Sequence, residues 1–223
     1  YPKIERLIFH LAVAPTDILQ QFRVGRLSLA SDLLPADAEA LRREPEFASG
    51  YHEVPRLMTY YAALNTHSGP LKDKALRQRV AQSIDVPTIV RETLGRLAIP
   101  ARGLISPGLL GNDSGYVSRP NVFSGTATKA APEEVELKAV LNPVFFGEYS
   151  AFAREAANAL REKHVVIKPI NKTMDEWVDA TTRGTADFVL GRWQADFPDA
   201  DRFANILDTK EGLLGRLCGS PEV

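Results

Sequence analysis

Strand-like and helix-like patterns alternate through the second half of the chain. Short apolar runs rich in β-branched residues are separated by segments with apolar side chains at helical spacing. These patterns predict strands at 135–142, 164–170 and 186–193 and helices at 150–163 and 173–184. The second helix has Thr173 at its N-cap, Glu176 at the capping-box position and Gly184 at its end. This β-α-β-α-β order with short connections predicts a parallel sheet that carries helices on its faces.

The first half of the chain has a weaker periodicity. Its patterns predict strands at 4–13, 26–31 and 56–66, helices at 15–25 and 35–47, and a helix pair that begins at Asp73 and Pro87. Residues 99–115 are rich in Gly and Pro, and the residues after them predict an irregular loop. We therefore divide the chain into a hinge segment of strand, helix and strand, a strand with a helix pair, the irregular loop, and the β-α-β-α-β segment: 1–34, 35–115, 116–134 and 135–223.

Composition excludes several classes of protein. With 223 residues, 44% hydrophobic and 25% charged, the chain resembles an ordinary globular protein. Its net charge of −1 gives no attraction towards nucleic acid, and no apolar run reaches the roughly 18 residues of a membrane-inserted helix. Cys218 is the only cysteine, so no internal disulfide can form, and we interpret it as structural or incidental. The first ten residues do not have the pattern of a signal peptide, and we expect the chain to be a piece of something longer.

Candidate ligand-binding residues follow two of the predicted strands. Trp193 and Asp196 come at the end of strand 186–193, and Phe145, Phe146 and Tyr149 follow strand 135–142. Ligands of open α/β sheets bind beyond the carboxyl ends of the strands. If these two strands are neighbours, aromatic surface and a carboxylate meet at one rim. Such a rim suits a ligand with an apolar body and a positive group.

The same residues also have structural interpretations. Trp193 is as often a core residue as a ligand contact, and Phe145 and Phe146 are more often packing residues. Asp199 and Asp201 suit a helix cap or a turn beside a proline. The cluster of acids raises the possibility of a calcium site, but its spacing does not match an EF-hand loop.

Residues that would indicate catalysis are sparse. The four His residues lack metal-ligand spacing, so a zinc site is not expected. There is no G-x-S-x-G nucleophile motif and no glycine-rich phosphate loop, and no cofactor is expected. The basic residues at 72–79 fit a solvated helix face better than a nucleic-acid surface. The residues therefore favour a binding module over an enzyme, and a hydrolase that uses Asp196 and Asp199 as acid and base stays as a third alternative.

Several stretches together resemble the family 5 bacterial extracellular solute-binding proteins, the receptors of peptide and nickel ABC importers. The longest is "YYAALNTHSGPLKDKALRQRVAQSIDVPTIVRETLGRLAIPARGLISPGLLG", residues 60–111. It matches the family pattern at Asn65, Pro70, Asp73, Arg77, Ile84, Asp85, Ile89 and Val90. Residues 1–30 resemble the preceding segment of the family, and "DFVLGRWQADFPDADRF" at 187–203 resembles its Trp-x-x-Asp segment.

The resemblance implies an α/β fold, a periplasmic-binding-protein-like lobe (type II, or cluster C), whose mixed sheet is flanked by helices and joined to hinge strands. The chain would be a single solute-binding lobe of a larger two-lobed receptor. Implied partners are a peptide or similar small cationic solute and ABC transporter permease subunits. The implied location is periplasmic or extracellular, with membrane association only through regions outside this segment.

The resemblance also implies a role for one residue. In peptide-binding members, the Asp three residues after the Trp pairs with the α-ammonium of the ligand, and here that residue is Asp196. The chain departs from the family in two places. No Arg stands between Asn142 and Arg154 to hold a ligand carboxylate, and "NVFSGTATKAAPEEVE" replaces a family helix with a Leu-Leu pair. These departures leave open a ligand-sensing domain fused to a signalling or transcription-regulatory protein.

Overall fold

The computed structural model describes residues 3–101, 103–112 and 133–219. Contacts divide the chain into two compact units, residues 1–53 and residues 54–223, and each is described by itself. The irregular loop expected at 116–134 lies almost entirely outside the described residues.

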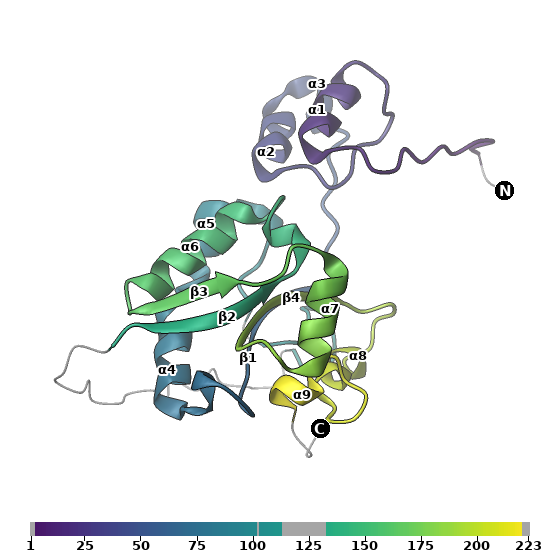
Figure 1. Cartoon of the computed structure of the whole chain (residues 1–223). Helices are drawn as coiled ribbons and strands as arrows, with labels where there is room; N and C mark the ends of the chain where they lie inside the picture. Colours follow the sequence, from purple (N-terminus) through teal and green to yellow (C-terminus); the bar gives the residue numbers. More distant parts are fainter. Residues whose placement is uncertain (1–2, 102, 113–132, 220–223) are drawn as a thin grey trace. The chain divides into compact units, whose positions relative to one another are not determined.

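The larger unit is built on a four-stranded mixed sheet with the order β1-β4-β2-β3 (Figure 1). Its strands are β1 (Met58–Leu64), β2 (Val135–Leu141), β3 (Val165–Pro169) and β4 (Phe188–Gln194). β2 pairs in parallel with both β3 and β4, which confirms the parallel β-α-β-α-β arrangement predicted for this part of the chain. β1 pairs antiparallel with β4 and makes the sheet mixed.

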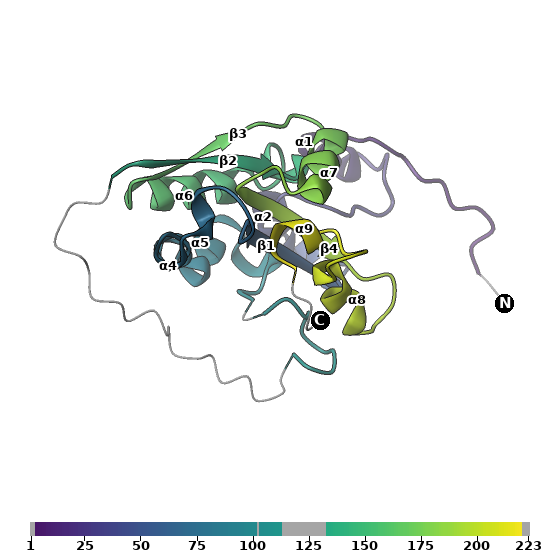
Figure 2. The same cartoon turned by 60° about the horizontal axis from the view of Figure 1, so that its bottom comes forward.

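Helices cover both faces of this sheet (Figures 1 and 2). The α-helices of this unit are α4 (Lys74–Ser83), α5 (Val86–Thr93), α6 (Ser150–Arg161), α7 (Met174–Arg183), α8 (Asp201–Ala204) and α9 (Gly215–Cys218). Short 3-10 turns lie at η1 (Pro70–Lys72), η2 (Gly95–Leu97), η3 (Pro143–Phe145) and η4 (Asn205–Leu207). α4 and α6 contribute Val80 and Leu160 to the core on one face, whereas α7 and α9 contribute Trp177 and Leu217 to the core on the other. The mixed sheet flanked by helices agrees with the predicted α/β class.

Local sequence signals account for the ends of several helices. Asp73 caps α4 by accepting a hydrogen bond from the backbone N–H of Ala75, and Asp85 caps α5. The predicted capping box of α7 is present, with Thr173 and Glu176 satisfying each other's backbone N–H groups. Gly184 ends α7 in the left-handed conformation.

The smaller unit contains the helices α1 (Pro15–Arg23), α2 (Pro35–Arg43) and α3 (Pro45–Ala48). Phe22 and Phe47 pack with their ring centroids 5.4 Å apart.

The strands predicted in the smaller unit at 4–13 and 26–31 are wrong, because neither segment is in a strand. Ile8 and Phe9 are largely exposed, at 64% and 74%. These segments have β-forming residues but pair with no other strand within residues 3–53. Isolated strands are not stable without such pairing.

Candidate ligand-binding site

β4 carries the candidate site, and one of its edges is only partly paired. It pairs with β1 along its whole length, from Phe188 to Gln194. It pairs with β2 only as far as Leu190, which lies opposite Leu141. Arg192 and Gln194 therefore extend beyond the end of β2.

The direction of the main-chain groups follows from the antiparallel pattern. The N–H of Ala195 donates to the carbonyl of Leu57 across the β1 side, so the odd-numbered residues of β4 face β1. The N–H of Asn142, just past the end of β2, donates to the carbonyl of Leu190 at 2.8 Å, so the even-numbered residues face β2. The main-chain groups of Arg192 and Gln194 consequently lie on the edge where β2 has ended. Both residues are exposed, and among the described residues no hydrogen bond to this edge of either one is found. We call the main chain of Arg192–Gln194 on this side the open edge.

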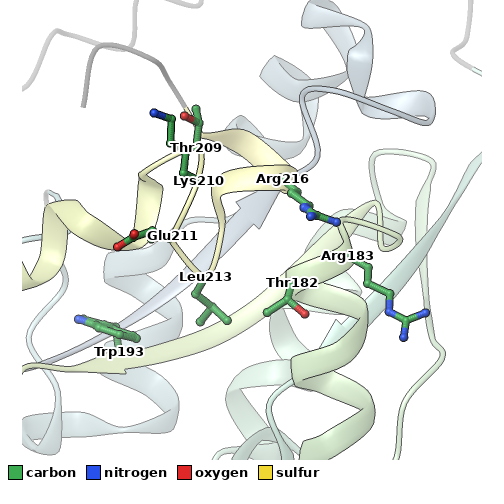
Figure 3. Close-up of a pocket in the computed structure, with 9 residues that line it drawn as sticks. Thr182, Arg183, Trp193, Thr209, Lys210, Glu211, Leu213 and Arg216 are labelled. Carbon is green, nitrogen blue, oxygen red and sulfur yellow. The ribbon is translucent and has the colours of Figure 1, made fainter.

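Trp193 lies between these two residues and points to the other side of the sheet plane from Leu190. It packs with Tyr61 and Leu213 against the core that α7 and α9 cover. Its indole Nε1 donates a 2.6 Å hydrogen bond to the carbonyl of Arg202, which fixes the ring. The ring also lines a surface pocket of about 490 Å³ between the end of α7 and the loop before α9 (Figure 3). The other lining residues are Thr182, Arg183, Thr209, Lys210, Glu211, Gly212, Leu213 and Arg216.

Asp196 lies two residues beyond the end of β4, and its side chain is 78% exposed. Its Oδ2 accepts a hydrogen bond from Nη2 of Arg202 at 3.1 Å. The guanidinium carbon of Arg202 also lies 5.3 Å from the centroid of the Phe197 ring. The carboxylate predicted to bind a cation therefore already has an internal cation beside it.

Asp199 forms the turn considered for it, whereas Asp201 caps no helix and lies in the first turn of α8. Asp199 accepts a hydrogen bond from the N–H of Asp201 at 3.0 Å, and Asp201 accepts one from Nδ2 of Asn205 at 2.9 Å. Among the described residues, no group of three or more His, Cys, Asp or Glu is arranged to hold a metal ion.

The aromatic residues after β2 lie mainly in the core. Phe145 is 3% exposed and packs against Tyr60 and Phe152, with ring centroids 5.9 and 6.3 Å away. Tyr149 is half-buried and stacks edge-on with Tyr60 at 4.9 Å. Burial, and then a hydrogen bond with Tyr60, raise the pKa of the Tyr149 hydroxyl. Phe146 is the most exposed of these aromatic residues, at 46%.

The structure therefore does not gather all five candidate residues at one place. β2 and β4 are neighbours, as the site hypothesis required. However, Phe145 and Tyr149 belong to the core on one face of the sheet, and Trp193 belongs to the core on the other. Asp196 follows Trp193 beyond the end of β4. Sequence reasoning missed both Arg202 and the open edge, because each depends on which segments become neighbours.

Comparison with known proteins decides the family. Residues 1–213 match the sequence profile of the bacterial extracellular solute-binding proteins, family 5 Middle. The chain belongs to this family. The resemblance inferred from the sequence motifs is thereby confirmed.

Two relatives show how much of a family member the chain represents. It is 27% identical over 210 residues to Di/tripeptide-binding protein 2 of Pseudomonas aeruginosa (strain UCBPP-PA14), covering 91% of this chain and 39% of the relative. It is 23% identical over 181 residues to the periplasmic murein peptide-binding protein MppA of Escherichia coli (strain K12), covering 73% of this chain and 32% of MppA. The chain thus spans about two fifths or less of these relatives.

Solved structures share the fold. OppA of Burkholderia pseudomallei superposes with a TM-score of 0.72 at 18% identity, over 94% of this chain and 43% of that one. OppA of Haemophilus influenzae, in complex with the peptide RPPGFSPFR, gives a TM-score of 0.67 at 19% identity, over 94% of this chain and 43% of that OppA. NikA of Brucella suis, in complex with Fe(III)-EDTA, gives a TM-score of 0.71 at 16% identity, over 91% of this chain and 44% of NikA. Within the part of the chain that the structure describes, no helix is long and apolar enough to cross a bilayer.

Proposed function

We propose that this chain is a peptide-binding lobe of the substrate-binding component of an ABC importer, acting in the periplasm or outside the cell without catalysing a reaction. Its relatives are named as binders of dipeptides, tripeptides and murein peptides, which supports a peptide ligand. The single observation that carries the proposal is the open edge of β4, followed directly by the exposed carboxylate of Asp196.

An extended peptide has the chemistry to pair with this edge. Peptides that add as a strand gain main-chain hydrogen bonds from an exposed strand edge. Arg192 and Gln194 each offer one N–H and one carbonyl on that side. Asp196 lies four residues beyond Arg192, or roughly 13 Å of extended chain. A peptide of two to four residues spans about 7–13 Å, so its main chain can reach the open edge while its α-ammonium reaches Asp196.

One lobe alone provides only part of such a site. A carboxylate as exposed as Asp196 gains about 0–1 kcal/mol from an ion pair, because water screens it. A second lobe that covered the ligand would desolvate the pair and strengthen it. We therefore expect residues 1–223 alone to bind peptides only at about millimolar concentration or weaker, which corresponds to about 4 kcal/mol. The complete protein should bind far more tightly.

Calorimetry with trialanine tests the proposal. The complete protein should bind trialanine, and Asp196→Asn should weaken binding by about tenfold or more, since a hydrogen bond to a charged group contributes about 1.5–3 kcal/mol. N-acetyltrialanine, which lacks the ammonium, should bind weakly to both proteins. Glu136→Gln is the matched control, because Glu136 is also an exposed, ion-paired carboxylate but lies at the start of β2, at the opposite end of the sheet.

Three results would contradict this proposal. One is that the complete protein does not bind trialanine, and another is that Asp196→Asn leaves the affinity unchanged. Micromolar binding by residues 1–223 alone would show instead that one lobe contains the whole site.

A further inference from the structure

Arg202 is held firmly beside the proposed ammonium site. Its carbonyl accepts the 2.6 Å hydrogen bond from Nε1 of Trp193, and its Nη2 donates to Asp196 at 3.1 Å. Its guanidinium also lies 5.3 Å from the centroid of the Phe197 ring. The side chain is only 35% exposed, and its Nε is buried with no hydrogen-bond partner among the described residues.

These contacts resemble those that a cationic ligand group would make. A carboxylate attracts an ammonium, and an aromatic face attracts a cation through its quadrupole. Here Asp196 and Phe197 already offer both interactions to Arg202. An ammonium that binds Asp196 must therefore either share this carboxylate with the guanidinium or displace it.

We propose that Arg202 is a built-in competitor for the ligand cation, and that it sets the selectivity of the site. This inference rests on the peptide-binding function proposed above. With Arg202 in place, the charge of Asp196 is balanced before the ligand arrives. A simple amine then gains little at Asp196. A peptide can still bind because it adds main-chain hydrogen bonds along the open edge.

The sign of the effect follows from the exposure of the two groups. Asp196 is 78% exposed, and an exposed ion pair does little to hold a carboxylate in place. Repulsion between the guanidinium and a ligand ammonium a few ångströms away acts directly, and it grows as the site is desolvated. Removing the charge of Arg202 takes away its repulsion of the ligand ammonium and its weak hold on the Asp196 carboxylate. The first effect should be larger, so the substitution should strengthen binding of the ammonium.

Calorimetry on the complete protein separates these effects. Arg202→Gln should bind trialanine about tenfold more tightly than wild type, which is about 1.4 kcal/mol. It should also bind ethylamine measurably more tightly, while its weak affinity for N-acetyltrialanine stays unchanged. Arg202→Lys keeps the charge and should retain an affinity near that of wild type. Adding Asp196→Asn to Arg202→Gln should abolish the gain.

Two controls keep the result interpretable. Arg154→Gln removes an arginine from another exposed ion pair, with Glu155 on α6, and should leave binding unchanged. Thermal melting of each variant establishes that it is folded.

The outcomes distinguish this inference from the proposed function. If wild type binds trialanine and Arg202→Gln binds it equally or more weakly, the competitor role is refuted and the peptide function stands. An equal gain for N-acetyltrialanine would also refute the competitor role, because that ligand has no ammonium. Failure of wild type to bind trialanine would refute the peptide function and this inference together.

Discussion

Replacing Asn65 should destabilise the larger unit more than almost any other single polar substitution. Asn65 follows β1 directly and is 1% exposed. Its Nδ2 donates to the carbonyls of Gly184 and Ala186 at 3.0 and 2.8 Å. Its Oδ1 accepts from the N–H groups of His67 and Ser68 at 3.0 and 2.9 Å. One side chain thus ties the end of β1 to the turn between α7 and β4.

The size of the effect can be worked out from these contacts. Each hydrogen bond contributes about 1 kcal/mol net, so losing four of them in Asn65→Ala should cost about 4 kcal/mol of unfolding free energy. With a urea m-value of about 2 kcal/mol/M, the unfolding midpoint should fall by about 2 M.

Urea unfolding followed by far-UV circular dichroism measures this shift. Asn158→Ala is the control, because Asn158 lies on α6 and its side-chain Oδ1 accepts one exposed hydrogen bond of 3.4 Å, from Nη1 of Arg161. Its midpoint should change little, since alanine also favours the helix. A fall of less than about 0.5 M for Asn65→Ala, or about 1 kcal/mol, would refute the reasoning that this side chain joins β1 to the rest of the sheet.

Two further predictions concern titratable groups. Hydrogen bonds from the N–H groups of Lys172 and then Thr173 hold the pKa of Glu176 below its usual value, so this carboxylate stabilises the fold at neutral pH and loses that effect as the pH falls through its folded pKa. The melting temperature of Glu176→Gln should therefore lie below that of wild type at about pH 7 and approach it at about pH 3; a pH-independent difference would contradict this. Burial raises the pKa of the Cys218 thiol to about 11, so iodoacetamide at about pH 8 should alkylate it slowly in the folded protein and much faster in urea. Equal rates in the two conditions would contradict the burial of this thiol.

Local signals were enough to predict the strands and helices from β2 to β4, but not α8 and α9 after them. The capping box of Thr173 and Glu176 and the left-handed Gly184 act within a few residues of themselves, so the sequence specifies both ends of α7 directly. The segments at 4–13 and 26–31 show the limit of such reasoning. Their β-forming residues indicate what a strand could contain, but a strand forms only where another segment supplies hydrogen bonds. No strand is present within residues 3–53 to pair with either segment.

The pairing partner of β1 could not be predicted from the sequence either. Its composition predicts a strand near the observed bounds, but nothing local indicates that it pairs antiparallel with β4, which lies more than 120 residues later in the chain. Asn65 shows why this pairing is specific. The two hydrogen bonds that its Nδ2 donates, to Gly184 and Ala186, form only when β1 ends next to the turn that enters β4, whereas the two that its Oδ1 accepts are local.

The candidate site combines two facts that the sequence can give with one that it cannot. Pro143 lacks an N–H group and opens a 3-10 turn, so β2 must end just before it. The run from Phe188 to Gln194 predicts a strand of seven residues, the same length as β2, so length alone does not decide whether either strand extends past the other. Only the register, with Leu141 opposite Leu190, shows that the end of β2 leaves the last part of β4 open on one side. A shift of the register by four residues would cover this edge and leave no main-chain groups free for a peptide. The register of a parallel pair depends on which side chains of both strands are buried together in the core, so it cannot be predicted from either strand alone.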